Sequence, residues 1–275
     1  MTQDTITTTF ADLGLTEPIV AALAERGIHA PFPIQELSIP DAVAGRDVCG
    51  KAKTGSGKSL AFGLPVLQTM APAKPKRPTG LVLVPTRELA NQVCDELLPA
   101  AAAVGRTVLA VYGGAPIERQ ISRLARGIEL VVATPGRMID LIDRRSVSVA
   151  DVNHVVVDEA DRMADMGFLP QVEWILRNID STHQTLLFSA TLDGVVNTLI
   201  RRYQHDPAMH ELDIEEITVE EMTHRFIAVH HMDKVKVAAA IAGSAERTMM
   251  FTRTKVMADR LARELAREGV EAAPI

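Results

Sequence analysis

The sequence has few cysteines, no targeting segment and no long apolar run. Its 275 residues include two cysteines, Cys49 and Cys94, and neither belongs to a CxxC motif or a Cys/His cluster, so a zinc site is not expected. The N-terminal MTQDTITTTF has neither the basic nor the apolar region of a signal peptide. No apolar run approaches the roughly 20 residues of a membrane-spanning helix. These absences favour a cytoplasmic protein with no membrane partner.

An excess of positive charge is also missing. The chain has 29 Lys and Arg against 35 Asp and Glu, a net charge of −6. Proteins that bind nucleic acid usually show a basic footprint. Bulk composition therefore slightly favours another kind of partner, unless the basic residues are concentrated on one face.

Short apolar runs alternate with helical patterns along most of the chain. Because these runs are apolar on both faces, they predict parallel strands that are buried on both sides. The expected fold class is α/β, a parallel sheet flanked by helices. In such sheets functional residues collect at the carboxyl ends of the strands. The runs are DVCGKA, LVLVPT, TVLAVYGG, ELVVATP, HVVVDEA and TLLFSAT.

The pattern changes after Tyr203. An acidic stretch without a long apolar period predicts a linker over 206–222, which separates a domain at 1–205 from the start of a second domain at 223–275. In this tail we expect strands at 225–231 and 248–254 and helices at 234–243 and 255–269. Two strands and two helices rarely bury enough apolar surface to be stable alone. We therefore expect the tail to be mobile, to dock on the first domain or to pair with another copy.

A glycine-rich segment, AKTGSGKS at 52–59, lies between a strand-like run and a helical pattern. This placement predicts a phosphate-binding loop, whose glycines let backbone N–H groups converge on phosphate oxygens. A lysine at its end would neutralise the β and γ phosphates, and the following hydroxyl would ligate Mg²⁺. A plain glycine-rich turn is the alternative. The residues expected to bind the nucleotide are Thr54, Gly55, Ser56, Gly57, Lys58 and Ser59.

An apolar strand ends in two carboxylates at VVVDEAD. Asp158 would hold Mg²⁺, and Glu159 would orient or deprotonate the attacking water. A solvated pair of acids at a strand end is the alternative. The nearby phosphate loop favours the catalytic interpretation, because ATP hydrolysis needs both parts on one sheet.

Seven elements stand in one order along the chain: Phe10, GIHAPFPIQ at 27–35, PTRELA at 85–90, Gly113–Gly114, TPGR at 134–137, DEAD at 158–161 and SAT at 189–191. In this order they resemble the DEAD-box family of ATP-dependent RNA helicases. They span about Phe10 to Thr191, and the weaker match MMFTRTK extends the resemblance to Lys255. The resemblance implies a RecA-like P-loop NTPase domain followed by an incomplete second RecA-like domain.

The resemblance also implies roles for particular residues. Gln35 would read the adenine edge, Phe10 would pack on the adenine face, and Ser189 with Thr191 would link the nucleotide state to domain closure. Phe32 departs from the pattern, since the family usually has Thr or Ser there. RNA would be bound through its backbone, without sequence specificity. The residues implied for that path are Pro85, Thr86, Arg87, Gly114, Thr134, Gly136 and Arg137.

A complete core of this family has a second domain with arginines that reach the γ-phosphate, and no HRxGR-like segment is found here. An arginine finger is worth roughly 10³ to 10⁵ in rate. We therefore expect this chain to bind Mg-ATP but to turn over poorly alone.

Three functions remain open from the sequence. The first is an RNA-stimulated ATPase that remodels or unwinds RNA duplexes. The second is a truncated, ATP-responsive RNA-binding module without unwinding activity. The third is a P-loop ATPase that acts on something other than nucleic acid. If RNA is the partner, Arg87, Arg137 and the loop Lys74–Arg77 should share one face.

Overall fold

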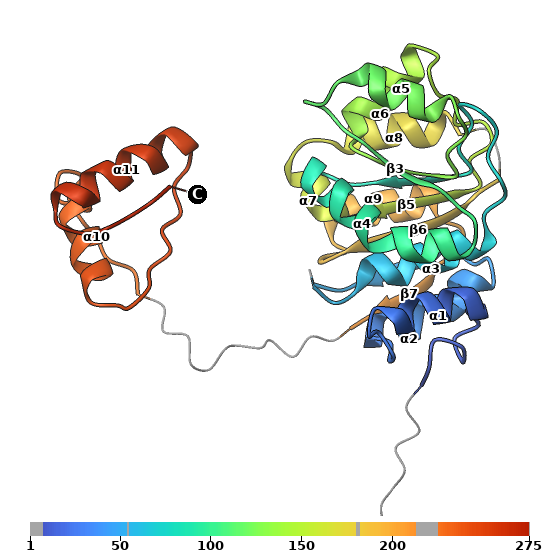
Figure 1. The fold of residues 1–275 in the computed structure, drawn as a ribbon, viewed down its shortest axis with the longest axis horizontal. Coiled ribbons are helices and arrows are strands. Elements are labelled where there is room, and N and C mark those ends of the chain that lie inside the picture. The colour runs from blue at the N-terminus through green and yellow to red at the C-terminus, as the bar shows by residue number, and fades with distance from the viewer. Residues whose placement is uncertain (1–7, 54, 180–181, 213–224, 275) are drawn as a thin grey trace, which may run out of the picture. The chain divides into compact units, whose positions relative to one another are not determined.

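The computed structural model describes residues 8–53, 55–179, 182–212 and 225–274. The chain divides into two compact units, Met1–Glu215 and Glu216–Ile275. Figure 1 shows the helices and strands of both units. Among the described helices, none combines the length and the apolar character needed to cross a membrane.

The first unit is built on one parallel sheet of seven strands, in the order β3-β4-β2-β5-β6-β1-β7. All six apolar runs of the sequence form strands of this sheet, which confirms the predicted α/β class. Each of β1 to β6 is short and largely buried. Because all strands are parallel, the loops that follow them lie at the same edge of the sheet. The strands are β1 (Val48–Lys51), β2 (Gly80–Leu83), β3 (Val108–Val111), β4 (Leu130–Ala133), β5 (His154–Asp158), β6 (Gln184–Ser189) and β7 (Ala208–Glu211).

Helices cover both faces of the sheet because successive strand residues point to opposite sides. Val82 and Val156 face the core shared with the first four helices, whereas Leu83 and Val157 face the core shared with the next five. The first group is α1 (Glu17–Glu25), α2 (Pro33–Val43), α3 (Lys58–Thr69) and α4 (Arg87–Ala103). The second group is α5 (Ile117–Leu124), α6 (Pro135–Asp143), α7 (Ala160–Asp165), α8 (Leu169–Arg177) and α9 (Gly194–Tyr203).

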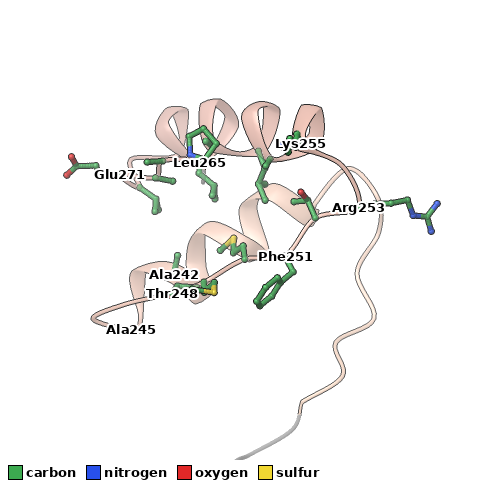
Figure 2. A pocket seen from close by; sticks show the side chains of 18 of the residues that line it. Ala242, Ala245, Thr248, Phe251, Arg253, Lys255, Leu265 and Glu271 are labelled. Carbon is green, nitrogen blue, oxygen red and sulfur yellow. The ribbon is translucent and has the colours of Figure 1, made fainter. Parts of the chain in front are cut away.

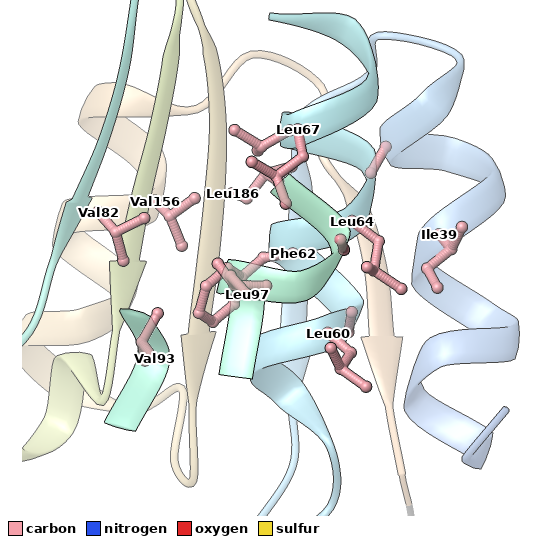
Figure 3. Close-up of a cluster of buried hydrophobic side chains, with 14 of the residues drawn as sticks. Ile39, Leu60, Phe62, Leu64, Leu67, Val82, Val93, Leu97, Val156 and Leu186 are labelled. Atoms are coloured by element: carbon pink, nitrogen blue, oxygen red, sulfur yellow. The ribbon is translucent and has the colours of Figure 1, made fainter. Parts of the chain in front are cut away.

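Tight packing fixes α3 over the sheet. Figure 3 shows Phe62 and Leu97 against the strand residues Val82, Val156 and Leu186. The rings of Phe62 and Phe188 lie 5.6 Å apart, and a Cβ added to Gly63 would collide with the side chain of Leu97. Since α3 begins at Lys58, this packing also fixes the phosphate loop that precedes it.

The strand β7 was not expected from the sequence. Ala208–Glu211 pairs in parallel with Val48–Lys51 of β1 and lies inside the predicted linker 206–222, which therefore begins too early. Only Ala208 is buried in this strand, because an edge strand needs apolar contacts on one face alone. Residues 213–222 of the predicted linker lie outside the described residues.

The second unit contains α10 (Lys234–Gly243) and α11 (Lys255–Arg267), as predicted. The expected strands at 225–231 and 248–254 are wrong, since the described residues of this unit form no strand. A strand requires a neighbour for its backbone hydrogen bonds, and two short runs cannot complete a sheet.

A cavity of about 740 Å³ lies within this second unit, between the two helices and the segments 248–254 and 270–274. Figure 2 shows it beside Ala242, Phe251 and Leu265. Phe251 is 90% exposed and Met249 is 71% exposed. The cavity is thus an incompletely covered apolar face, and it contains none of the predicted site residues.

Candidate nucleotide and RNA site

The predicted phosphate loop follows β1 and ends at the start of α3. Gly55 and Gly57 have φ of +87° and +84°, a region that side chains with a Cβ rarely adopt. Gly57 is the N-cap of α3, so the positive end of the helix dipole faces the loop. Lys58 is buried, and its Nζ donates to the carbonyl of Ala52 at 2.9 Å. Ser59 follows on α3 and is half-buried, whereas Thr54 lies outside the described residues.

Gln35 is hydrogen-bonded to the end of the predicted phosphate loop. It is buried on α2, its Nε2 donates to the carbonyl of Gly57 at 2.9 Å, and its Oε1 accepts from the N–H of Phe32 at 2.8 Å. A Cβ added to Gly57 would collide with the Gln35 amide. Each end of the amide thus makes one bond to a protein group, and each has a second hydrogen-bonding position with which it could contact an adenine edge.

Asp158 ends β5 and is buried. Its Oδ1 accepts the N–H of Glu159 at 2.9 Å. Burial raises the pKa of Asp158 to about 7, while the cation of Lys58 opposes this rise and Glu159 adds to it. A carboxylate in this position is stabilised by a divalent cation, so the buried acid fits the predicted Mg²⁺ site.

Glu159 occupies the left-handed region, with φ 51° and ψ 48°, and is the N-cap of α7. This conformation is uncommon for a residue with a Cβ and is concentrated at functional sites. Its carboxylate is 3.1 Å from Nη1 of Arg162. The pattern VVVDEAD did not indicate that partner, which lies one turn along α7.

Ser189 connects the two parts of the site. It ends β6, the strand between β5 and β1. Its hydroxyl accepts the N–H of Asp161 at 3.1 Å, and its carbonyl accepts the N–H of Ala52 at 3.0 Å. Thr191 is exposed, and the N-cap of α9 is Asp193, so Thr191 does not cap that helix.

The residues implied for RNA lie at the other half of the same edge, after β2, β3 and β4. Thr86 caps α4 and accepts the N–H of Leu89. Arg87 is exposed beside it, and its Nη1 would be 4.0 Å from a Cβ on Gly114. Gly114 has φ +81°, and Gly136 is exposed at the start of α6. These groups form a surface of one cation, a hydroxyl and accessible backbone.

Two implied contact residues are less available. The side chain of Arg137 is 12% exposed, and its Nη1 donates to the carbonyl of Ala115 and to Oε1 of Gln120. It therefore supports the loop after β3 from within and is not a solvated cation. Pro85 is buried, and Thr134 begins α6 as its N-cap without a side-chain cap bond.

Phe10 does not lie as the resemblance implies. Its side chain is 1% exposed and belongs to the core formed by α1 to α4. In this structure its ring has no free face for an adenine base. The position of Phe10 in the sequence does not predict its burial, because burial depends on contacts with residues that are distant in the sequence.

The expectation that Lys74–Arg77 shares a face with Arg87 and Arg137 is wrong. The loop precedes β2, while Arg87 follows it, and Arg137 follows β4, which pairs in parallel with β2. The loop and the two arginines therefore lie at opposite ends of the strands. Arg77 instead pairs with Asp151 at 2.6 Å, which fits an exposed loop.

Comparison with known proteins adds an independent result. The sequence model of the DEAD/DEAH box helicase family matches residues 32–199. The chain is 39% identical to the ATP-dependent RNA helicase CshA of Listeria monocytogenes over 264 residues, which is 95% of this chain and 51% of that protein. It is 38% identical to the DEAD-box ATP-dependent RNA helicase CshA of Bacillus subtilis over 269 residues, 97% of this chain and 54% of that one.

Among solved structures, the fold is similar to that of a DEAD box protein from the hyperthermophile Methanococcus jannaschii. The TM-score is 0.70 and the sequence identity 28%, over 97% of this chain and 72% of that one. The chain spans about half the length of the curated relatives it matches.

Proposed function

Because the chain belongs to the DEAD/DEAH box helicase family, we propose that it binds Mg-ATP at residues 52–59 and supplies one half of an RNA-dependent ATPase that remodels RNA. Its first unit would hold the nucleotide and part of the RNA backbone. The names of its relatives and the order of its motifs support this proposal. A cytoplasmic location belongs to it as well, supported by two free cysteines, one of them buried.

One observation carries the proposal: a buried lysine follows β1 and a buried acid ends β5, at the same edge of the sheet with one strand between them. Lys58 and Asp158 are 7% and 2% exposed. The strand between β1 and β5 ends in Ser189, which is hydrogen-bonded to both motifs. Burying charges without ligands is costly, and a magnesium-bound triphosphate would match this charge pattern.

Each residue would act through its position. Bound Mg-ATP would supply the γ-phosphorus and the Lewis acid. Lys58 would neutralise phosphate charge, Asp158 would hold the cation, and Glu159 would orient or deprotonate the attacking water. Ser189 would transmit a shift of the phosphate loop to the DEAD segment, because its two hydrogen bonds join them. Turnover by this chain alone should be slow, since it has no HRxGR-like segment.

RNA would lie along the half of the edge formed by β2, β3 and β4. Exposed Arg87, the Thr86 hydroxyl and the glycines suit phosphate groups and carry no sequence information. Arg87 is the exposed cation of this surface and its Nε pairs with Glu88 at 2.6 Å, so RNA would be held mainly by the hydroxyl and the backbone groups. The second candidate, an ATP-responsive RNA-binding module without unwinding, has the same geometry and differs only in turnover.

Calorimetry with Mg-ADP and Mg-ATP tests nucleotide binding. We expect Lys58→Ala to abolish measurable binding, whereas Lys74→Ala, at the opposite end of the strands, should bind as the wild type does. A wild-type protein that is folded by circular dichroism and binds neither nucleotide would refute the proposal.

Binding of single-stranded RNA tests the second part. Arg87→Ala should weaken RNA binding several-fold at low salt and lessen its salt dependence, while Lys74→Ala should change neither. Nucleotide binding with no RNA affinity would favour an ATPase that acts on another substrate. RNA binding without RNA-stimulated hydrolysis, even with the second domain of a relative supplied, would favour the non-catalytic module.

A further inference from the structure

We propose that Phe32 provides the aromatic surface on which the nucleotide base packs, the role that the resemblance assigns to Phe10. This inference rests on the proposed function, since it concerns the same nucleotide site. It assigns a base-contacting role to a position where the family usually has a small hydroxyl residue.

Phe32 lies beside the phosphate loop and is open to solvent. It is 56% exposed, and a Cβ built on Gly57 would lie 2.7 Å from its Cδ2. The ring is therefore in contact with the loop that would hold the phosphates. Exposed apolar residues are common and need no explanation by themselves, so the position of this ring carries the inference.

The backbone holds Phe32 in the same cluster as Gln35. Its N–H donates to Oε1 of Gln35, and the other end of that amide donates to Gly57. An aromatic face and a side-chain amide thus lie together next to the phosphate loop. A base-binding site needs these two elements, one to pack on the ring system and one to read its polar edge.

The local sequence restricts the backbone that carries the ring. Phe32 stands between Pro31 and Pro33, and its φ of −76° and ψ of 156° match the extended conformation that a following proline favours. Since its backbone is restricted before any ligand binds, little backbone entropy is lost on binding.

The aromatic side chain also cannot cap the helix with a hydrogen bond. Phe32 is the N-cap of α2, where Ser or Thr would accept a backbone N–H and typically stabilise the helix by about 1 kcal/mol. Only the reverse bond is present here, from the Phe32 N–H to Gln35. The sequence therefore places a ring where local helix stability favours a hydroxyl.

Phe10 cannot supply this surface in the present structure. It is 1% exposed, within the core that also contains Ile19 and Ile34. Of these two phenylalanines, the exposed one lies against the phosphate loop, so the base would pack on Phe32.

Calorimetry on the full chain with Mg-ADP tests the inference. We expect Phe32→Ala to weaken Mg-ADP about tenfold, near the lower end of what loss of one base-stacking ring costs. Phe32→Tyr should bind as the wild type does. Phe32→Thr restores the hydroxyl cap, so it should raise the melting temperature yet bind as weakly as Phe32→Ala. Phe226→Ala, at a phenylalanine that is 98% exposed in the second unit, should change nothing.

Inorganic tripolyphosphate separates contact with the base from an effect on the loop. It carries no base, so its affinity, measured by competition with ADP, should be equal in the wild type and in Phe32→Ala. An equal loss for both ligands would overturn the inference, because the ring would then act by shaping the loop. Unchanged Mg-ADP affinity in Phe32→Ala would also overturn it. Absence of nucleotide binding by the wild type would instead refute the proposed function.

Discussion

The two units show opposite outcomes for similar sequence patterns. In the first unit, runs such as HVVVD become strands with a neighbour on each side, and every residue of β5 is buried. In the second, TMMFTRT stays without strand structure, and Phe251 remains 90% exposed. Both runs are apolar and both precede a helix.

The difference shows that an apolar run becomes a strand only when neighbours satisfy its backbone. Backbone N–H and C=O groups require partners when they are buried, and β5 obtains them from β2 and β6. A helix satisfies its own backbone, which explains why α10 and α11 form in the second unit while its strands do not.

The largest test compares two phenylalanines, one from each unit. Phe188→Ala should destabilise the first unit by about 3–5 kcal/mol, because it removes a fully buried ring and leaves a cavity. Phe251→Ala should change stability by less than about 0.5 kcal/mol, since that ring is exposed. Urea unfolding followed by circular dichroism measures both. Comparable losses in the two variants would show that Phe251 is buried in solution.

A second test uses the buried acid of the first unit. The pKa of Asp158 is raised by burial from 3.8 to about 7, so the folded state binds a proton more tightly than the unfolded state does. The stability contributed by this tighter proton binding is fully present below about pH 4 and is lost as the pH rises through about 7. Asp158→Asn has no carboxylate to ionise and so does not suffer this loss. Its free energy of unfolding relative to the wild type should therefore increase by about 2–3 kcal/mol between pH 5 and pH 8.

Thermal unfolding of the nucleotide-free protein at the two pH values measures this effect. Asp165→Asn, at an exposed carboxylate on the same helix α7, is the matched control and should show no such dependence. Asp158→Asn should also lose Mg-nucleotide binding while becoming more stable, because a site can lower stability for the sake of function. If the difference in stability between Asp158→Asn and the wild type is the same at both pH values, burial does not raise the pKa of Asp158.

The smallest test compares two equivalent helix caps. Thr86 in the first unit and Thr254 in the second each accept an N–H three residues on, from Leu89 and Met257 at 3.2 Å. Replacing either with Ala should cost about 1 kcal/mol. For Thr86 this should only lower the melting temperature slightly, since packing stabilises α4.

For Thr254 the same loss should reduce helicity at 222 nm, because short helices with little packing are marginal in water. Only Leu265 is buried on α11. Equal, purely thermal effects in both variants would indicate that the second unit has a core as cooperative as that of the first.

The sequence predicted the elements whose signals are local. The apolar runs predicted β1 to β6, and the glycine-rich segment predicted a loop that ends at the start of α3. The acids Asp158 and Glu159 were placed correctly at the end of a strand. Each of these depends on residues that are adjacent in the chain.

Features that depend on distant contacts were not predictable. The edge strand β7 has a single buried residue, Ala208, and so has no apolar pattern. The burial of Phe10 and the internal bonds of Arg137 arise from packing between elements. The location of Lys74–Arg77 followed from strand direction, which the spacing of basic residues does not encode.

The order of the strands has a thermodynamic consequence. The proposed phosphate site after β1 and the proposed RNA surface after β2 are separated by β6 and β5, about 14 Å at the usual strand spacing. If binding at one site changes the affinity at the other, linkage requires the change to be reciprocal. Whatever factor RNA adds to nucleotide affinity, nucleotide must add to RNA affinity, so either ligand can report on the other.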